Sequence, residues 1–127
     1  MKAKWITPAV TALDEKGHVD IQANLEIYDF LIKNGMDGIL IFGSIGEFFA
    51  IPLEEKKALI QAALAHINHR VTVYVGTCHM ELETCVELSN YAIEQGADGV
   101  MIISPYYFSL PDSALLNFYG TLAQRVK

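Results

Sequence analysis

The residues best suited to bind an anion lie in the segment 37–49. Here an apolar run, Ile39 to Phe42, is typical of a strand buried on both faces, and Gly43-Ser44-Ile45-Gly46-Glu47 follows it directly. Two glycines permit tight turns in which consecutive backbone N–H groups converge on a carboxylate. The spacing alone is equally consistent with a simpler role, in which the glycines only turn the chain toward a helix beginning near Pro52.

Other polar and aromatic groups follow the other expected strands. Because the carboxyl ends of parallel strands meet at one edge of a sheet, we expect these side chains to converge. A hydroxyl, free N–H groups and a tyrosine pair suit an oxyanion or carboxylate substrate and proton transfer. For the two tyrosines, an aromatic packing patch or an interface is the alternative. The side chains concerned are Ser44, Glu47, Thr77, Cys78, His79, Tyr106 and Tyr107.

The elements that position these groups contain a repeat. The pattern Gly-x-Asp-Gly followed by four apolar residues occurs at 35–42 and again at 96–103. Room for one further strand and its helices lies between the two copies. The offset equals two βα units of roughly 30 residues each.

Apolar strands alternate with amphipathic helices along the whole chain, which predicts a parallel sheet in the order βαβαβαβα. We expect strands at 5–12, 39–42, 71–75 and 100–104, and helices at 21–34 with Asp20 as N-cap, from Pro52 to about His69, at 81–95, and from a cap at Asp112 or Ser113.

An open doubly wound sheet and a barrel both fit this order. No strand precedes a dinucleotide-binding glycine fingerprint or a Walker lysine, and the repeat favours the barrel. A complete (β/α)₈ TIM barrel needs ~250 residues. We therefore expect an α/β chain, residues 1–127 forming one domain, that supplies about four βα units, a half-barrel.

Composition excludes several classes of protein. Hydrophobic residues make up 52% of the chain, which excludes a disordered tail, and a net charge of −6 argues against nucleic acid as a partner. The N-terminus has the pattern of neither a signal peptide nor a membrane span, so we expect a cytoplasmic protein. No metal ion or cofactor is expected, because His66 and His69 lack a third ligand and Cys78 and Cys85 read as reduced thiols.

Four segments of the sequence resemble the dihydrodipicolinate synthase / N-acetylneuraminate lyase family, the class I pyruvate-dependent aldolases built on a (β/α)₈ barrel. They occur in the family's order and span nearly the whole chain. They are Val10 to Asp14 with Gly17 and Asp20; Gly43 to Glu47, close to the family's Gly-(Ser/Thr)-Thr-Gly-Glu; Val75-Gly76-Thr77; and Gly96 to Gly99 leading to Pro105-Tyr106-Tyr107.

The resemblance implies roles for individual residues. The loop Gly43, Ser44, Ile45 and Gly46 would bind the carboxylate of pyruvate or a 2-keto acid through its N–H groups, and Ser44 would also relay a proton between two tyrosines. Tyr107 would be the relay tyrosine lent across a tight dimer interface, with Tyr106 packed beside it. We therefore expect a homo-oligomer.

The sequence also departs from the family. Ile45 replaces a threonine, Cys78 and Met80 replace Gly and Asn, and the family's Schiff-base lysine lies beyond Lys127. Such a lysine must be desolvated or lie beside another cation. None of the lysines present is expected to be so placed, since they lie at the termini, in a turn or on helices, as Lys56 does.

Three hypotheses follow. The first is the N-terminal half of a Schiff-base aldolase, with Phe48-Phe49 and the missing threonine favouring a sugar-acid substrate over dihydrodipicolinate synthesis. The second, favoured by the absent lysine, is a catalytically inactive half-barrel that self-assembles as a structural module. The third is an unrelated open α/β domain that binds a small anion.

Overall fold

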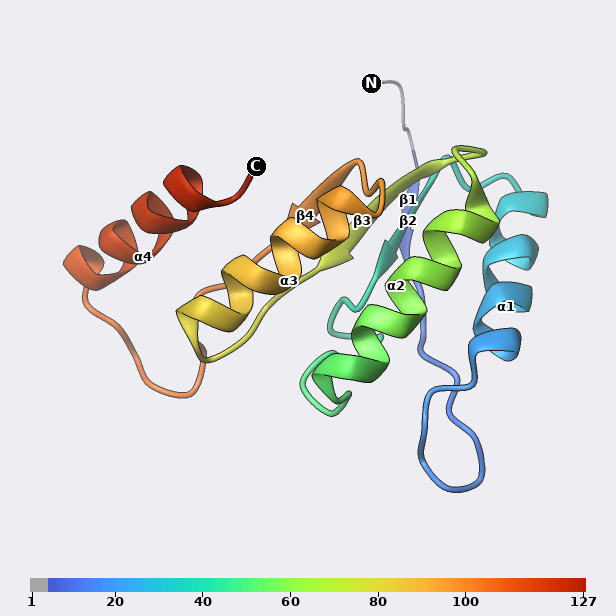
Figure 1. The fold of residues 1–127 in the computed structure, drawn as a ribbon, viewed down its shortest axis with the longest axis horizontal. Coiled ribbons are helices and arrows are strands. Elements are labelled where there is room, and N and C mark those ends of the chain that lie inside the picture. The colour runs from blue at the N-terminus through green and yellow to red at the C-terminus, as the bar shows by residue number, and fades with distance from the viewer. Residues whose placement is uncertain (1–4) are drawn as a thin grey trace.

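Four strands and four helices alternate along the chain (Figure 1). The structure, a computed structural model, describes residues 5–127. The elements are β1 (Ile6–Pro8), α1 (Ile21–Lys33), β2 (Gly38–Ile41), α2 (Leu53–Ile67), β3 (Thr72–Gly76), α3 (Leu82–Glu94), β4 (Gly99–Met101) and α4 (Asp112–Arg125). This is the predicted order, with β1 and β4 shorter than expected. The expected lack of a signal peptide rests partly on residues 1–4, which lie outside the described residues.

The strands form one parallel sheet in the order β1-β2-β3-β4, with Ile39 of β2 opposite Val73 of β3. Helices α1, α2 and α3 lie side by side against one face of this sheet (Figure 1). Ile39, Ile41 and Val75 point into that layer and are fully buried. Helix α4 packs on α3 through Phe118 at the end of the row. The architecture is the predicted half-barrel of about four βα units.

The other face of the sheet carries apolar side chains that no helix covers. Leu40 and Tyr74 are half-buried, while Ile6 and Met101 are exposed. Together with Val100 they line an open apolar groove of about 340 Å³. The prediction that β2 is buried on both faces was therefore wrong for the described residues. Side chains alternate along a strand, and only the set that faces the helices is enclosed.

The sequence repeat has a structural explanation. The Asp98 carboxylate accepts a hydrogen bond from the backbone N–H of Val73, and the Asp37 carboxylate accepts one from the N–H of Trp5. Each aspartate thus precedes its own strand and holds the start of the neighbouring strand. The glycine that follows each aspartate makes room for a side chain of that neighbour, Tyr74 beside Gly99 being one case. The repeat therefore encodes the pairing of adjacent parallel strands.

The segment between β1 and α1 is fastened by side chains from two helices. The buried Asn24 amide accepts from the Ala12 N–H and donates to the carbonyls of Ala12 and Asp20, while Asp20 caps α1 by accepting from the Ala23 N–H, as predicted. Glu55 of α2 accepts from the Val19 N–H at 2.7 Å, which lowers the pKa of its carboxyl. This segment carries residues that support the loop after β2.

The chain turns sharply where β2 ends. Phe42 has a φ of 58°, a left-handed conformation that is uncommon for a bulky residue, and its ring is buried. The turn places the Phe42 carbonyl oxygen 2.0 Å from the position that a Cβ of residue 76 would take. Only glycine fits at position 76, so Gly76 allows β2 and β3 to end side by side.

Two further features differ from or extend the sequence analysis. Helix α4 begins at Asp112 with Pro111 in the N-cap position and no capping side chain, so the expected cap at Asp112 or Ser113 was wrong. Among residues 5–127, no helix is both long and apolar enough to cross a membrane.

Gly76→Ala should destabilise the fold by about 3 kcal/mol or more, because the new methyl group would overlap the Phe42 carbonyl and force the backbone apart. Urea unfolding followed by circular dichroism measures the change. Gly120→Ala, on α4 with open space around it, is the matched control and should be neutral or slightly stabilising. Equal stability of the two variants would contradict this account.

Asn24→Ala should cost about 2 kcal/mol or more, because it removes an amide that satisfies both backbone groups of Ala12. Gln22→Ala on the same helix removes only a surface contact with Glu26 and should change the free energy of unfolding by less than ~0.5 kcal/mol. A comparison of the two urea midpoints decides the point, and an Asn24 variant as stable as the Gln22 variant would refute it.

Candidate functional site

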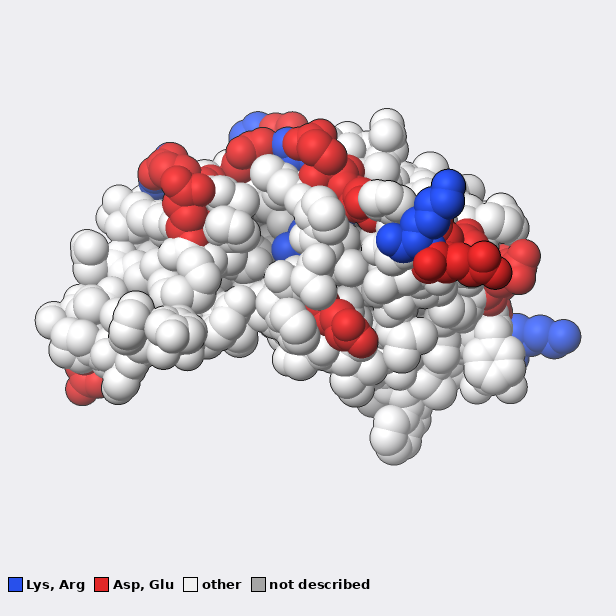
Figure 2. All heavy atoms as spheres, turned by 90° about the horizontal axis from the view of Figure 1, so that it is seen from below, with Lys and Arg blue, Asp and Glu red and all other residues white. Residues whose placement is uncertain are grey.

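The loop after β2 lies at the end of the molecule where all four strands terminate, the end that Figure 2 views. Its central part is anchored from the β1–α1 segment, since the Thr11 hydroxyl donates to the Gly46 carbonyl at 2.7 Å. Within the loop, the Glu47 N–H donates to the Ser44 carbonyl at 3.1 Å. Ser44 is exposed, Gly46 is buried and Ile45 is 57% exposed.

Three consecutive backbone N–H groups of this loop, those of Ser44, Ile45 and Gly46, have no acceptor within residues 5–127, and the first two belong to exposed residues. Unused N–H groups in succession form a concave positive site that suits a carboxylate. The geometry therefore supports the anion-binding role predicted for this loop, and that role stays a prediction.

Of the two tyrosines, Tyr106 lies beside the loop and Tyr107 does not contact it. The Tyr106 ring packs edge-on against Phe48, with centroids 5.8 Å apart. Tyr107 is 75% exposed and packs edge-on against Phe108. Within residues 5–127, no hydrogen bond joins Ser44 to either tyrosine. The structure thus brings Tyr106 to the predicted site and leaves Tyr107 exposed.

Thr77 turns away from the site that the sequence suggested, while Cys78 lies at its edge and is also held by the backbone after β4. The Thr77 hydroxyl is fully buried, 2.7 Å from the Ser89 hydroxyl, and Ser89 donates its own proton to the Cys85 carbonyl. Thr77 must therefore be the donor to Ser89. The Cys78 sulfur accepts from the Ile103 N–H at 3.1 Å. Thr77 therefore ties the end of β3 to α3, and Cys78 ties it to the end of β4.

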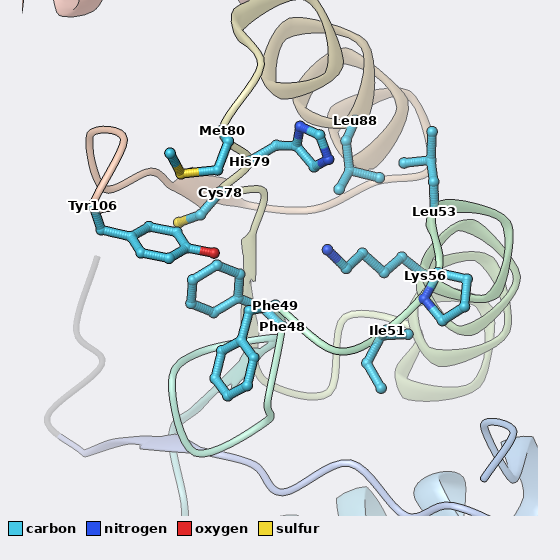
Figure 3. A pocket seen from close by; sticks show the side chains of 11 residues that line it. Phe48, Phe49, Ile51, Leu53, Lys56, Cys78, His79, Met80, Leu88 and Tyr106 are labelled. Atoms are coloured by element: carbon cyan, nitrogen blue, oxygen red, sulfur yellow. The ribbon is translucent and has the colours of Figure 1, made fainter. Parts of the chain in front are cut away.

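A cavity of about 290 Å³ opens next to the loop (Figure 3). It lies between the segments that follow β2 and β3 and the start of α2. The Lys56 amine and the Tyr106 hydroxyl both point into it (Figure 3). The lining residues are Phe48, Phe49, Ile51, Pro52, Leu53, Lys56, Cys78, His79, Met80, Leu88 and Tyr106.

The expectation that no lysine of this chain is desolvated was wrong for Lys56. The residue is only 4% exposed, and its burial lowers the pKa of the amine. Lys57, the next residue, forms ion pairs with Glu54 and Glu87, and the hydrogen bond to Glu87 raises its pKa. The two adjacent lysines alone did not show which of them lies on the buried face of α2. Position 56 lies one turn before Leu59 and Ile60 on the buried face, which is the signal that was missed.

Most charged side chains at this end of the molecule lie along its rim, and few lie on the surface that the rim borders. Figure 2 shows acidic and basic side chains gathered along one rim and a largely uncharged surface elsewhere. Asp29 of α1 pairs with Arg70, which follows α2, at 2.7 Å and lies 2.9 Å from the ring nitrogen of His66 on α2. His66 is therefore part of a hydrogen-bonded cluster on the surface. Within residues 5–127, no group of three or more His, Cys, Asp or Glu side chains is arranged to hold a metal ion.

Comparison with known proteins identifies the class to which this fold and site correspond. Residues 1–127 match the Dihydrodipicolinate synthetase family. The chain is 36% identical over 121 residues to YagE of Escherichia coli (strain K12), provisionally named a 2-dehydro-3-deoxy-D-gluconate aldolase, covering 95% of this chain and 40% of YagE. It is 38% identical over 117 residues to the 4-hydroxy-tetrahydrodipicolinate synthase of Bacillus subtilis (strain 168), covering 92% of this chain and 40% of that enzyme.

A solved structure agrees with these matches. YagE of E. coli K12, described as belonging to the dihydrodipicolinic acid synthase family and solved in complex with pyruvate, superposes with a TM-score of 0.93 at 34% identity. The superposition covers 99% of this chain and 42% of YagE. The chain therefore belongs to the dihydrodipicolinate synthetase family, as its motifs predicted. It spans about 40% of the length of the relatives that it matches.

Both thiols should react slowly in the folded chain. Burial raises the pKa of Cys78 and of Cys85, and the thiolate is the reactive form. We expect alkylation by iodoacetamide at pH 8 to be slower by about tenfold or more than in the same chain unfolded in urea. Mass spectrometry of the labelled peptides follows each cysteine separately. Similar rates in the two states would show that these thiols are exposed.

Proposed function

We propose that this chain forms the N-terminal part of a class I aldolase or lyase that acts on pyruvate or a related 2-keto acid through a Schiff base. The observation that carries the proposal is the row of unused N–H groups at Ser44, Ile45 and Gly46, at the carboxyl end of β2 in a member of this family. In TIM barrels, active sites are built at this end of the strands. The YagE complex with pyruvate supports the choice of ligand.

Each residue of the site has a separate role in this proposal. The loop Gly43 to Gly46 binds the substrate carboxylate through its N–H groups, which gives orientation without requiring a cationic side chain. The exposed Ser44 hydroxyl passes a proton, and Tyr106 packs beside the loop on Phe48. The exposed Tyr107 is available to the site of a neighbouring protomer in a cytoplasmic homo-oligomer. The Schiff-base lysine is supplied by residues beyond Lys127.

The substrate is proposed to be a 2-keto acid derived from a sugar acid. Ile45 stands where the resemblance places a threonine, so the site lacks one hydroxyl donor to the carboxylate region. Phe48 and Phe49, with ring centroids 5.6 Å apart, add an aromatic wall after the loop. The similarity to YagE, with its sugar-acid aldolase name, supports this class.

Ile45→Thr should strengthen pyruvate binding by up to about tenfold, because a hydroxyl that donates to a charged carboxylate adds about 1.5 kcal/mol. Ile45→Val has the same branched shape without the hydroxyl and is the matched control, expected to bind as the original chain does. Titration of backbone amide resonances by nuclear magnetic resonance measures the affinities and locates the site.

Three outcomes of that titration are informative. Pyruvate shifts that centre on the amides of Ser44, Ile45 and Gly46 support the proposal. Equal or larger shifts with phosphate would instead indicate a general anion-binding domain. No shift with either anion, in a chain that self-associates, would favour the inactive structural half-barrel.

A further inference from the structure

The loop after β2 is held by a hydroxyl from another part of the chain. Thr11, in the segment between β1 and α1, donates its hydroxyl proton to the Gly46 carbonyl at 2.7 Å, a half-buried contact between residues 35 positions apart. Residue 46 lies so close to this segment that a Cβ there would be 3.0 Å from the Ala9 carbonyl oxygen and 3.2 Å from the Thr11 hydroxyl. The loop therefore rests directly on the β1–α1 segment.

The backbone on either side of Thr11 is itself anchored. Before it, the Ala9 N–H donates to the Leu40 carbonyl of β2 at 3.0 Å. After it, Ala12 is held by the buried Asn24 amide of α1, which accepts from the Ala12 N–H and donates to the Ala12 carbonyl. The Thr11 hydroxyl is thus presented by backbone that both the sheet and a helix hold in place, and it forms a fixed support for the loop.

Two peptide groups connect this support to a free N–H group. The first joins Gly46 to Glu47, and its carbonyl accepts from Thr11 while its N–H donates to the Ser44 carbonyl at 3.1 Å. The second joins Ser44 to Ile45, and its N–H, that of Ile45, has no acceptor within residues 5–127. Both peptides are trans, so in each the N–H points opposite to the carbonyl. The Thr11 bond therefore constrains the direction of the Ile45 N–H.

The same two bonds polarise the free N–H and hold an unfavourable backbone conformation. A peptide carbonyl that accepts a hydrogen bond makes the N–H of its own peptide group a stronger donor, and successive bonds reinforce one another. The Ile45 N–H ends such a chain. Between the two bonds, Glu47 has a φ of 51°, a left-handed conformation that residues other than glycine rarely adopt. Its side chain is exposed, so this conformation depends on the backbone bonds and would relax without them.

The geometry points to Thr11 as the positioning residue of the anion-binding loop: its hydroxyl holds the Gly46–Glu47 peptide so that the Ile45 N–H is aimed and polarised for a substrate carboxylate. Thr11 acts through the loop and need not touch the substrate. This role rests on the proposed function, since it explains how a loop proposed to bind a 2-keto acid keeps its shape before the ligand arrives. A loop that is already ordered binds more tightly, because less conformational freedom is lost on association.

The test compares Thr11→Val, which keeps the branched shape and removes the hydroxyl, with Thr11→Ser, which keeps the hydroxyl. We expect the valine variant to bind pyruvate about fivefold more weakly, since one hydrogen bond is lost, and the serine variant to bind within about twofold of the original chain. Titration of backbone amide resonances measures both affinities. Thr121→Val is the matched control, because the Thr121 hydroxyl also donates to a backbone carbonyl, that of Asn117, but on α4, so its loss should leave binding unchanged.

A second readout needs no ligand. Without the Thr11 hydroxyl, the carbonyl carbon resonance of Gly46 should move, and the Glu47 amide should exchange with solvent about fivefold faster. The Gly17 amide, which donates to the Asp14 carbonyl in an exposed turn of the β1–α1 segment, should keep its original exchange rate. Thr11→Ser should restore both signals, and Thr11→Ala gives the same comparison if the valine variant does not fold.

The two readouts distinguish failure of this role from failure of the proposed function. Unchanged pyruvate affinity in Thr11→Val would overturn the role of Thr11 while leaving the pyruvate site intact. A loss of affinity that serine does not restore, or that leaves the Gly46 and Glu47 signals unchanged, would overturn it as well. If the original chain binds no pyruvate and Thr11→Val still loosens Glu47, the proposed function fails, and with it the substrate role of Thr11, although the contact with the loop stands.

Discussion

The close approach of the Phe42 carbonyl to Gly76 is the constraint on which the rest of this structure depends. The left-handed turn at Phe42 ends β2 abruptly and aims the next residues outward, while the missing side chain at position 76 lets β3 end alongside. The loop that carries the free N–H groups and the segment that carries Cys78 and His79 therefore begin at the same level. Their proximity places the loop after β2 and the cavity side by side.

The two sites differ in how they treat charge. The β2 loop offers partial positive charge from backbone dipoles that are fixed before any ligand arrives, and no side chain must be desolvated. The cavity instead contains the Lys56 amine, whose pKa is lowered by burial. The first arrangement suits reversible binding of a carboxylate. Phe48 belongs to both, since its ring touches Tyr106 and lies near the Lys56 amine.

Features that depend on nearby residues could be predicted from the sequence. The Asp20 cap, the alternation of strands and helices and the paired Gly-x-Asp-Gly segments were all readable, because each depends on neighbours a few residues away or on a repeated pattern. The inward turn of Thr77, the central role of Asn24 and the burial of Lys56 were not readable. Each depends on a partner in another element or loop, Ser89, Ala12 and Phe48 respectively, and the spacing of residue types along the chain does not reveal such partners.

Each strand of this sheet pairs only with the strand that precedes or follows it in the sequence. Every βα unit can therefore dock on the unit already made, with short loop closures and little search, as the polypeptide leaves the ribosome. The repeated aspartates direct this growth, because each secures the strand before it. Within the described chain, β4 lies at the edge of the sheet and Leu40 and Tyr74 form an uncovered row, so this edge offers backbone groups to which a further strand could pair.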